Sequence, residues 1–319
     1  MNTPILILLF NRPKETKILI NRLRKIKPSQ IYISQDGPRD QLSDDIALCQ
    51  KVRDIIREID WDCKIKKKFN KVNLGCRTSV SSALHWLFEN EKNGIILEDD
   101  CIPSKSFFHF CKQMLERYEN SENIYSISGS NFQRNQKIGK GDYYFSKYAH
   151  CWGWATWKRA WKNYDDDMKF WTQLKNSNLW NELHPISLEK KYWSRIFDDV
   201  YKRKIDSWAY VWLASVWNAG GKSIIPNKNL IVNIGFNEFA TNTLSYSKVD
   251  EKSLKFLELD NNISHPREES INYDADQYVF KNHFNGKYNF WPWRFIYIIK
   301  ILINEPLTFL LKIKKFYRK

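Results

Sequence analysis

Apolar residues in the first half of the chain follow two different periods. Continuous apolar runs, as in residues 4–10 and 94–97, are typical of strands that are buried on both faces. In residues 80–88, by contrast, Val, Ala, Leu, Leu and Phe occupy positions i, i+3, i+4, i+7 and i+8, which predicts an amphipathic helix. Further strands are expected at 31–33, 64–69 and 124–127, and a further helix at 44–59. Strands that alternate with helices form βαβ units, so the sequence predicts an α/β fold with a mostly parallel sheet flanked by helices.

Three consecutive carboxylates, Glu98, Asp99 and Asp100, follow directly on the run 94–97. Ligands of open α/β sheets lie beyond the carboxyl ends of the strands. Carboxylates this close raise each other's pKa unless a cation is shared between them. Hard ions such as Mn²⁺ or Mg²⁺ bind carboxylate oxygens and keep positions for phosphates. The pattern therefore favours a metal site that holds a diphosphate. The alternative is a solvated acidic turn before a helix that Ser104 caps.

Composition narrows the classes of partner. The chain has 319 residues and a net charge of +15, which implies attraction to a nucleotide diphosphate, a phospholipid surface or nucleic acid. No nucleic-acid recognition module is visible, so nucleic acid is not an expected partner. The six cysteines have neither CxxC nor zinc-like spacing, and no leader or apolar stretch of membrane-spanning length appears. We therefore expect a cytosolic protein with reduced thiols.

Five short segments stand out along the chain: Asn11-Arg12, Ser34-Gln35-Asp36, Glu98-Asp99-Asp100, Gly153-Trp154 and the Trp-rich stretch 208–212. In these segments and in their order the chain resembles nucleotide-sugar glycosyltransferases of the GT-A fold. From about Pro4 to Thr243 the chain resembles N-acetylglucosaminyltransferase I and its bacterial relatives. The resemblance implies a Rossmann-like GT-A fold and an inverting, metal-dependent glycosyltransferase of hexosyltransferase type. The donor would be a nucleoside-diphosphate sugar, UDP-linked, and the acceptor a glycan or lipid-linked molecule in surface polysaccharide synthesis.

The resemblance also assigns roles within the first three segments. Arg12 and Asp36 would hold the base and ribose of the nucleotide. Asp100 would bind Mn²⁺ or Mg²⁺ directly, while Asp99 would reach the ribose hydroxyls and Glu98 would orient the group. An arginine suits a diphosphate or a stacked ring, and a carboxylate accepts a hydrogen bond from a uracil N–H.

Aromatic residues of the second half are candidates for sugar contacts. Aromatic faces stack on the apolar C–H faces of sugars, so Trp154 is expected at the substrate cleft, with Trp208 also on the donor or acceptor side. The alternative is that these rings pack into the core. His150 would form a hydrogen bond with a substrate hydroxyl or with the backbone, because an oxygen-rich acid site argues against a histidine metal ligand.

Inverting sugar transfer needs a carboxylate that takes the proton from the attacking hydroxyl. Relatives often carry this acid immediately after the first tryptophan of the segment 206–212, where this chain has Ala209. We expect Asp206 to supply the base, at the N-terminus of a helix over 208–217 whose dipole keeps it ionised. Two alternatives remain: Asp206 is an ordinary N-cap, or the protein is an inactive relative that binds a nucleotide sugar or glycan.

Residues 230–243 resemble the family's segment that closes over the donor. Gly235 would act as its hinge, and Thr241 and Thr243 would donate hydrogen bonds to phosphate oxygens. Many bacterial relatives carry a histidine where this chain has Asn242. A second acidic run at 165–167 follows a helical pattern and is expected to be a solvated cap.

The composition changes again near the C-terminus. Residues 291–303 and 307–316 interleave apolar and aromatic residues with Lys and Arg, which is typical of a helix lying in an anionic membrane surface. The alternative is a terminal helix docked on the body. We expect a glycosyltransferase domain of residues 1–283, with a nucleotide-binding half (1–130) and an acceptor and catalytic half (131–283). A basic amphipathic tail (284–319) would hold the protein peripherally on the inner face of the cell membrane.

Overall fold

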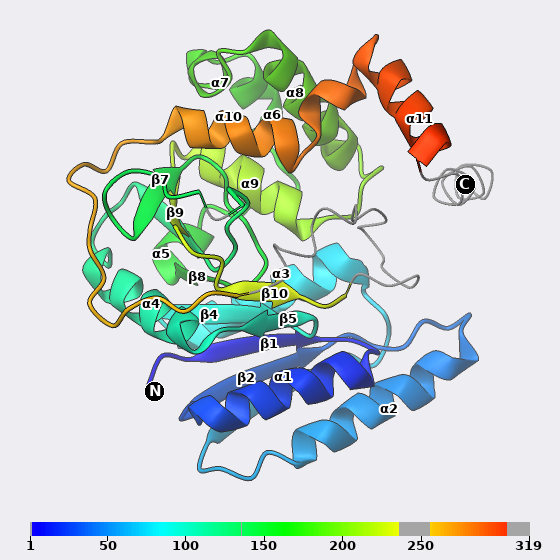
Figure 1. Ribbon diagram of the computed structural model, residues 1–319. Coiled ribbons are helices and arrows are strands. Elements are labelled where there is room, and N and C mark those ends of the chain that lie inside the picture. The colour runs from blue at the N-terminus through cyan, green and yellow to red at the C-terminus, as the bar shows by residue number, and fades with distance from the viewer. Residues whose placement is uncertain (1, 135, 236–255, 305–319) are drawn as a thin grey trace.

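The computed structural model describes residues 2–134, 136–235 and 256–304 (Figure 1). It confirms the α/β prediction, since one large, mostly parallel sheet is flanked by helices. The sheet has eight strands in the order β3-β2-β1-β4-β8-β6-β9-β7. Their bounds are Ile5–Leu9 (β1), Gln30–Gln35 (β2), Lys64–Phe69 (β3), Asn93–Glu98 (β4), Ile124–Ser128 (β6), Tyr143–Ser146 (β7), Trp154–Trp157 (β8) and Lys222–Pro226 (β9).

Strands β1 to β4 are all parallel to one another. β1 pairs in parallel with both β2 and β4, and β3 extends the parallel sheet beyond β2. β8 runs antiparallel between β4 and β6, and β7 runs antiparallel to β9 at the far edge. The carboxyl ends of β1, β2 and β4 therefore meet at one edge of the sheet, which is where ligands of open α/β sheets bind.

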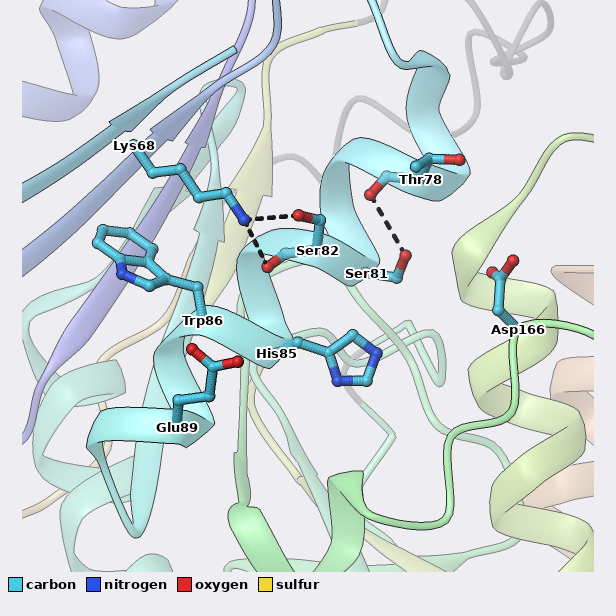
Figure 2. Close-up of a pocket in the computed structure, with 8 residues that line it drawn as sticks. All are labelled: Lys68, Thr78, Ser81, Ser82, His85, Trp86, Glu89 and Asp166. Atoms are coloured by element: carbon cyan, nitrogen blue, oxygen red, sulfur yellow. Dashed lines mark hydrogen bonds between the residues drawn. The ribbon is translucent and has the colours of Figure 1, made fainter.

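The helices cover both faces of the sheet. They are Pro13–Ile26 (α1), Ser43–Arg57 (α2), Gly75–Asn90 (α3), Lys105–Arg117 (α4), Lys158–Trp161 (α5), Trp171–Lys175 (α6), Asn178–Leu183 (α7), Ser187–Tyr201 (α8), Trp208–Asn218 (α9), Tyr273–Asn282 (α10) and Trp293–Asn304 (α11). The structure confirms the helices predicted over 44–59, 80–88 and 208–217. The outward side of α3 carries a row of polar side chains (Figure 2). In the part of the chain that the structure describes, no helix has the length and apolarity needed to cross a membrane.

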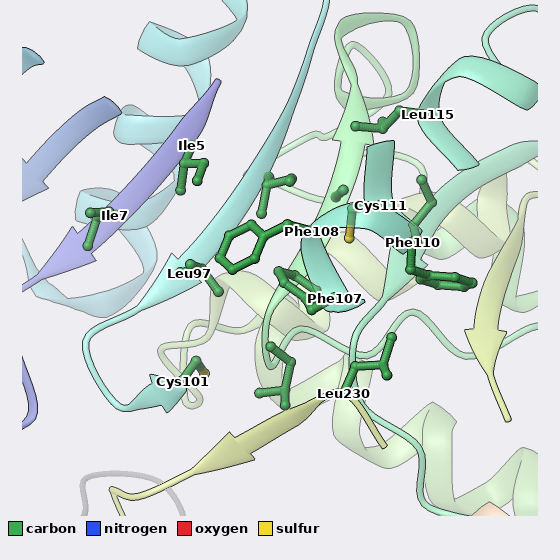
Figure 3. Close-up of a cluster of buried hydrophobic side chains, with 14 of the residues drawn as sticks. Ile5, Ile7, Leu97, Cys101, Phe107, Phe108, Phe110, Cys111, Leu115 and Leu230 are labelled. Atoms are coloured by element: carbon green, nitrogen blue, oxygen red, sulfur yellow. The ribbon is translucent and has the colours of Figure 1, made fainter. Parts of the chain in front are cut away.

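The core has two halves because the side chains of each strand alternate between its faces. Ile5 and Ile7 of β1 pack with α1, α2 and α4, where phenylalanines and a cysteine of α4 fill the space under the sheet (Figure 3). Leu6 and Leu8 face the opposite side, where α3, α8 and α9 contribute a cluster rich in tryptophan. The Trp-rich sequence of the second half is thus mainly core.

The sheet is continuous across residue 130, the expected boundary between the two halves of the main domain. β8, which follows that boundary in the sequence, lies between β4 and β6, which precede it. A second, two-stranded sheet pairs β5 (Cys101–Pro103) with β10 (Ile231–Asn233) in antiparallel fashion. This pairing brings residues near 100 and near 233 together at the edge where β4 ends.

Candidate functional site

The site lies where β1 and β4 end side by side. The loop after β1 holds Arg12, and β4 leads into the three acids. The Nη1 atom of Arg12 donates to Oδ1 of Asp99 at 3.1 Å and to Oδ2 of Asp100 at 2.7 Å. The structure therefore brings together residues that are 87 and 88 positions apart in the sequence. The cation between Asp99 and Asp100 is thus the Arg12 guanidinium, and the metal ion expected at these acids stays a prediction.

Burial dominates the electrostatics of these acids. It raises the pKa of Glu98 to about 8 and that of Asp99 to about 7, and the neighbouring carboxylates add to both shifts. Burial also raises the pKa of Asp100, against the opposing charge of Arg12. Among the residues that the structure describes, none donates a hydrogen bond to the carboxylate of Glu98. When all three carboxylates are ionised, they carry more negative charge than Arg12 balances, so a cation that binds there would favour their ionised forms.

The donor set fits an ion that is shared with a substrate. Within the described ranges no group of three or more His, Cys, Asp or Glu side chains is arranged to hold a metal ion alone. Asp100 and Asp99 together offer two carboxylates. Mg²⁺ is typically held by one or two carboxylates, with phosphate oxygens and water completing the octahedron. The expected ligand, Asp100, is compatible with such a site but not with a closed protein cage.

The segment after β10 packs directly on Asp100. The Ile234 N–H donates to the Asp100 carbonyl at 2.8 Å, and the side-chain amide of Asn233 donates to Asp100 Oδ1 at 3.3 Å. At Gly235 a Cβ atom would lie only 2.1 Å from Asp100 Oδ2, so this position requires glycine. Sequence analysis missed Asn233, because its contact arises from pairing between β5 and β10. Thr241, Asn242 and Thr243 lie outside the described residues.

Asp36 is near the site at the end of β2, but its carboxylate is already occupied. Oδ1 accepts hydrogen bonds from the N–H of Gly37 at 2.9 Å, from the Asn70 amide at 3.1 Å and from the Leu74 N–H at 3.0 Å. Oδ2 accepts from the Asn73 amide at 3.0 Å and from Leu74 at 3.3 Å. These donors use the acceptor positions of the group. The carboxylate of Asp36 therefore holds the loop that leads into α3, and its expected contact with a uracil N–H stays a prediction.

The aromatic predictions are corrected. Trp154 is fully buried in β8, and its ring stacks on that of Trp208, also buried, with centroids 5.6 Å apart. β8 lies inside the sheet with both faces covered, so its side chains point into core rather than cleft. His150 is buried too and packs edge-on against Phe132 at 4.6 Å between centroids. Burial lowers the pKa of His150 well below its usual value, so the ring is a neutral core residue.

Asp206 stands at the rim of the site. It is exposed, and a Cβ atom at Gly75 would lie 3.1 Å from its Oδ2. The N-cap of α9 is the hydroxyl of Ser207, so Asp206 is not the cap of that helix. Partial desolvation raises the pKa of the Cys76 thiol to about 12 although the residue reaches the surface, and the charges of Glu98 and Asp206 add to the shift. Cys76, which sequence analysis did not single out, is thus within electrostatic range of both the acidic cluster and Asp206.

Comparison with known proteins gives distant structural similarity alone. No protein-family model matches the chain, and no curated protein matches its sequence. HddC from Yersinia pseudotuberculosis matches 49% of this chain and 77% of its own, at 12% identity and a TM-score of 0.30. The 4-diphosphocytidyl-2C-methyl-D-erythritol synthase of Anaerococcus prevotii matches 50% and 72%, at 14% identity and 0.32. An apo UDP-glucose pyrophosphorylase matches 71% and 90%, at 10% identity and 0.35. Similarity at this level does not assign an activity to the chain.

Proposed function

We propose that the protein is an inverting, metal-dependent glycosyltransferase. It moves a sugar from a nucleoside-diphosphate sugar, UDP-linked, to a glycan or lipid-linked acceptor in surface polysaccharide synthesis. The observation that carries this proposal is the cluster of Arg12, Asp99 and Asp100 at the carboxyl edge of β1 and β4. A divalent cation at this edge of the sheet would bind the phosphates of such a donor, and the carboxylates of the cluster would be its protein ligands.

Each residue of the cluster would have a different role in binding the donor. Asp100, with Asp99 beside it, would hold Mn²⁺ or Mg²⁺, which neutralises the charge of a leaving diphosphate. Arg12 already contacts both carboxylates, and its guanidinium is suited to bind a phosphate oxygen by a charge-assisted hydrogen bond. Glu98, which has no donor among the described residues, orients the loop or binds a hydroxyl of the donor.

Asp206 is the proposed base. Its carboxylate is exposed, so an acceptor could reach it, and its charge acts on the Cys76 thiol as that of Glu98 does. The acceptor hydroxyl oxygen bonds to the anomeric carbon, and the bond from that carbon to the diphosphate breaks. The hydroxyl proton passes to the carboxylate of Asp206.

A second reading is a catalytically inactive relative that binds a nucleotide sugar or a glycan. The observation that favours it is Ala209, which occupies the place in α9 where the relatives often carry an acid. Under this reading the cluster at Asp100 still binds the nucleotide sugar, but no proton is transferred.

The deciding experiment is Mn²⁺-dependent hydrolysis of UDP-, GDP- and CMP-sugars by the wild type, Asp100→Ala and Asp206→Asn. We expect one donor to be hydrolysed and both variants to lose at least tenfold in rate. Glu116→Gln, which changes an exposed carboxylate of α4, is the control and should match the wild type. Near-normal turnover by Asp206→Asn would remove that residue from the mechanism. Binding of a donor without turnover would support the inactive relative.

A further inference from the structure

A hollow lies on the outer side of α3, apart from the acidic cluster. Its volume is about 380 Å³, and the helix contributes most of its lining (Figure 2). Thr78, Ser82, His85 and Glu89 follow the spacing i, i+4, i+7 and i+11, so they share one face of α3. Trp86 lies beside them. We name this hollow the α3 groove.

The side chains of the α3 groove combine hydroxyl, ring and carboxylate groups. The indole N–H of Trp161 donates to Nδ1 of His85 at 3.3 Å, which leaves the ring hydrogen on Nε2. Burial lowers the pKa of His85, so the ring is neutral and acts as a hydrogen-bond donor. Trp86 packs edge-on against Tyr32, with 5.0 Å between centroids, and remains partly exposed.

The charges of the groove are not suited to an anion. Lys68 is the one cation among its described lining residues, and its Nζ atom donates to the carbonyl of Ser82 at 3.0 Å and to its hydroxyl. Asp166, on the opposite wall, is bound by Arg77 and Arg203, each at 3.0 Å. The acidic run at 165–167 was expected to be a solvated cap, but it also forms ion pairs with Arg77 of α3 and with Arg203.

Unlike Asp166, Glu89 is not bound by any arginine that the structure describes. Its carboxylate is exposed and accepts no hydrogen bond from any residue in the described ranges. Its negative charge acts on Lys68, whose amine is already bound to Ser82, so this groove disfavours phosphate even in a chain with a net charge of +15. It suits a neutral molecule whose hydroxyls donate to Glu89 and whose C–H faces stack on Trp86.

The position of the groove connects it to the proposed base. α3 begins at Gly75, which is adjacent to Asp206, and Thr78 lies one turn further along. From Thr78 to Glu89 the helix rises about 16 Å, at roughly 1.5 Å per residue. A linear molecule that lies along this face of α3 points one end toward Asp206.

We propose that the α3 groove binds the neutral, hydroxyl-rich sugars of an extended acceptor glycan and directs its terminal hydroxyl toward Asp206. This inference rests on the proposed function and specifies the class of acceptor. The groove is a remote binding site, so it does not touch the reacting atoms.

The test is binding of the full-length protein to an array of oligosaccharides in the presence of EDTA and without nucleotide. Neutral chains of two to six sugars form one arm, and phosphorylated or sialylated chains form the other. We expect binding to neutral chains and a loss of at least tenfold in Glu89→Ala. Glu89→Gln, which keeps a hydrogen-bonding amide, should recover part of the binding. Glu116→Ala, which removes an exposed carboxylate of α4, should bind as the wild type does.

Three outcomes overturn the proposal: no neutral oligosaccharide is bound, Glu89→Ala binds as the wild type does, or binding is confined to anionic chains. Circular dichroism of Glu89→Ala checks that the helix remains folded. Because metal and donor are absent, the result is independent of the hydrolysis assay. Donor hydrolysis with no glycan binding would reject the groove alone, whereas glycan binding with no hydrolysis of any donor would reject the enzyme.

Discussion

Arg12 balances two carboxylates that are each about nine-tenths buried at the side chain, and its removal leaves both without a counter-charge. Breaking a buried pair costs about 3–5 kcal/mol, and we expect about 2 kcal/mol for Arg12→Ala because the guanidinium is partly exposed. Mn²⁺ should restore part of this loss, since a metal ion at Asp100 supplies the missing positive charge. Urea unfolding with EDTA and with Mn²⁺ measures both effects.

Arg24→Ala is the matched control for that prediction. Arg24 lies on α1, the helix that follows Arg12, and pairs with an exposed carboxylate of Asp60. Its loss should change stability little, with or without Mn²⁺. An Arg12→Ala protein that is destabilised equally in EDTA and in Mn²⁺ would show that the carboxylates do not take up the ion.

Gly235 offers a second prediction at this scale. A methyl group at this position would meet Asp100 Oδ2 at 2.1 Å, so Gly235→Ala must displace either the carboxylate or the segment after β10. We expect at least a tenfold loss of Mn²⁺ affinity, measured by calorimetric titration, with little loss of helix signal in circular dichroism. Unchanged Mn²⁺ affinity would contradict a displaced carboxylate, and unchanged affinity in Asp100→Ala as well would mean that Asp100 is not a ligand.

The positions of site residues could be predicted from the sequence where those residues directly follow a strand. The acids and Arg12 follow buried runs, and parallel strands bring such ends together. Asp36 follows the same rule, but its role depends on Asn70 and Asn73, whose loop folds back onto it. Nothing in the spacing of the sequence shows that these amides use up the carboxylate.

Among the elements, α10 is tied to the sheet through a buried acid. Asp276 accepts hydrogen bonds from the hydroxyl of Ser146 and from the N–H of Lys147, both at the end of β7. Burial raises the pKa of Asp276 to about 7. An unfolded aspartate titrates near pH 4, so between about pH 4 and 7 the folded protein holds a proton that the unfolded chain has released. The stability contributed by this group therefore falls as pH rises through that window.

Asp276→Asn should remove this dependence, because the amide does not ionise. We expect the wild type to lose more free energy of unfolding between pH 5 and pH 8 than the variant does, by up to about 3 kcal/mol. Urea unfolding at both pH values measures the difference. Asp274→Asn, in the exposed part of the same helical turn, should behave as the wild type. Equal pH dependence in wild type and Asp276→Asn would contradict the shifted pKa.

The elements of the first half were predictable because their apolar periods are long and regular. β8 is the instructive failure: its tryptophans suggested a cleft, but their place between β4 and β6 makes them core. Short aromatic segments carry no signal that separates a ring stacked on a sugar from a ring stacked on another tryptophan. Antiparallel insertion of a late strand into a parallel sheet is a tertiary outcome that local pattern does not specify.

At the scale of the whole molecule, α11 stands out because many of its large apolar side chains are exposed. The helix projects from the body beyond α8 and α10 (Figure 1), with Tyr297 stacked on Tyr288 at 5.1 Å. Large apolar side chains remain exposed along it, among them Phe295 at 59% and Ile303 at 73%, and Trp291 just before it is 84% exposed. The sequence that follows contains several lysines. Apolar side chains together with basic charge suit insertion into an anionic lipid surface, which is the membrane partner we propose.

Replacing Phe295 and Ile299 together by serine should weaken binding to vesicles of phosphatidylcholine and phosphatidylglycerol at least tenfold. Both side chains are exposed on α11, so their change leaves the core intact while it removes apolar area from the lipid contact. Co-sedimentation at low salt measures the effect, and Ile46→Ser, an exposed isoleucine of α2, is the matched control. High salt should release the protein in part, because the electrostatic contribution is screened and the apolar contribution remains. If the wild type ignores these vesicles but forms a dimer that Phe295→Ser with Ile299→Ser abolishes, then α11 contacts a second copy of the chain instead of lipid.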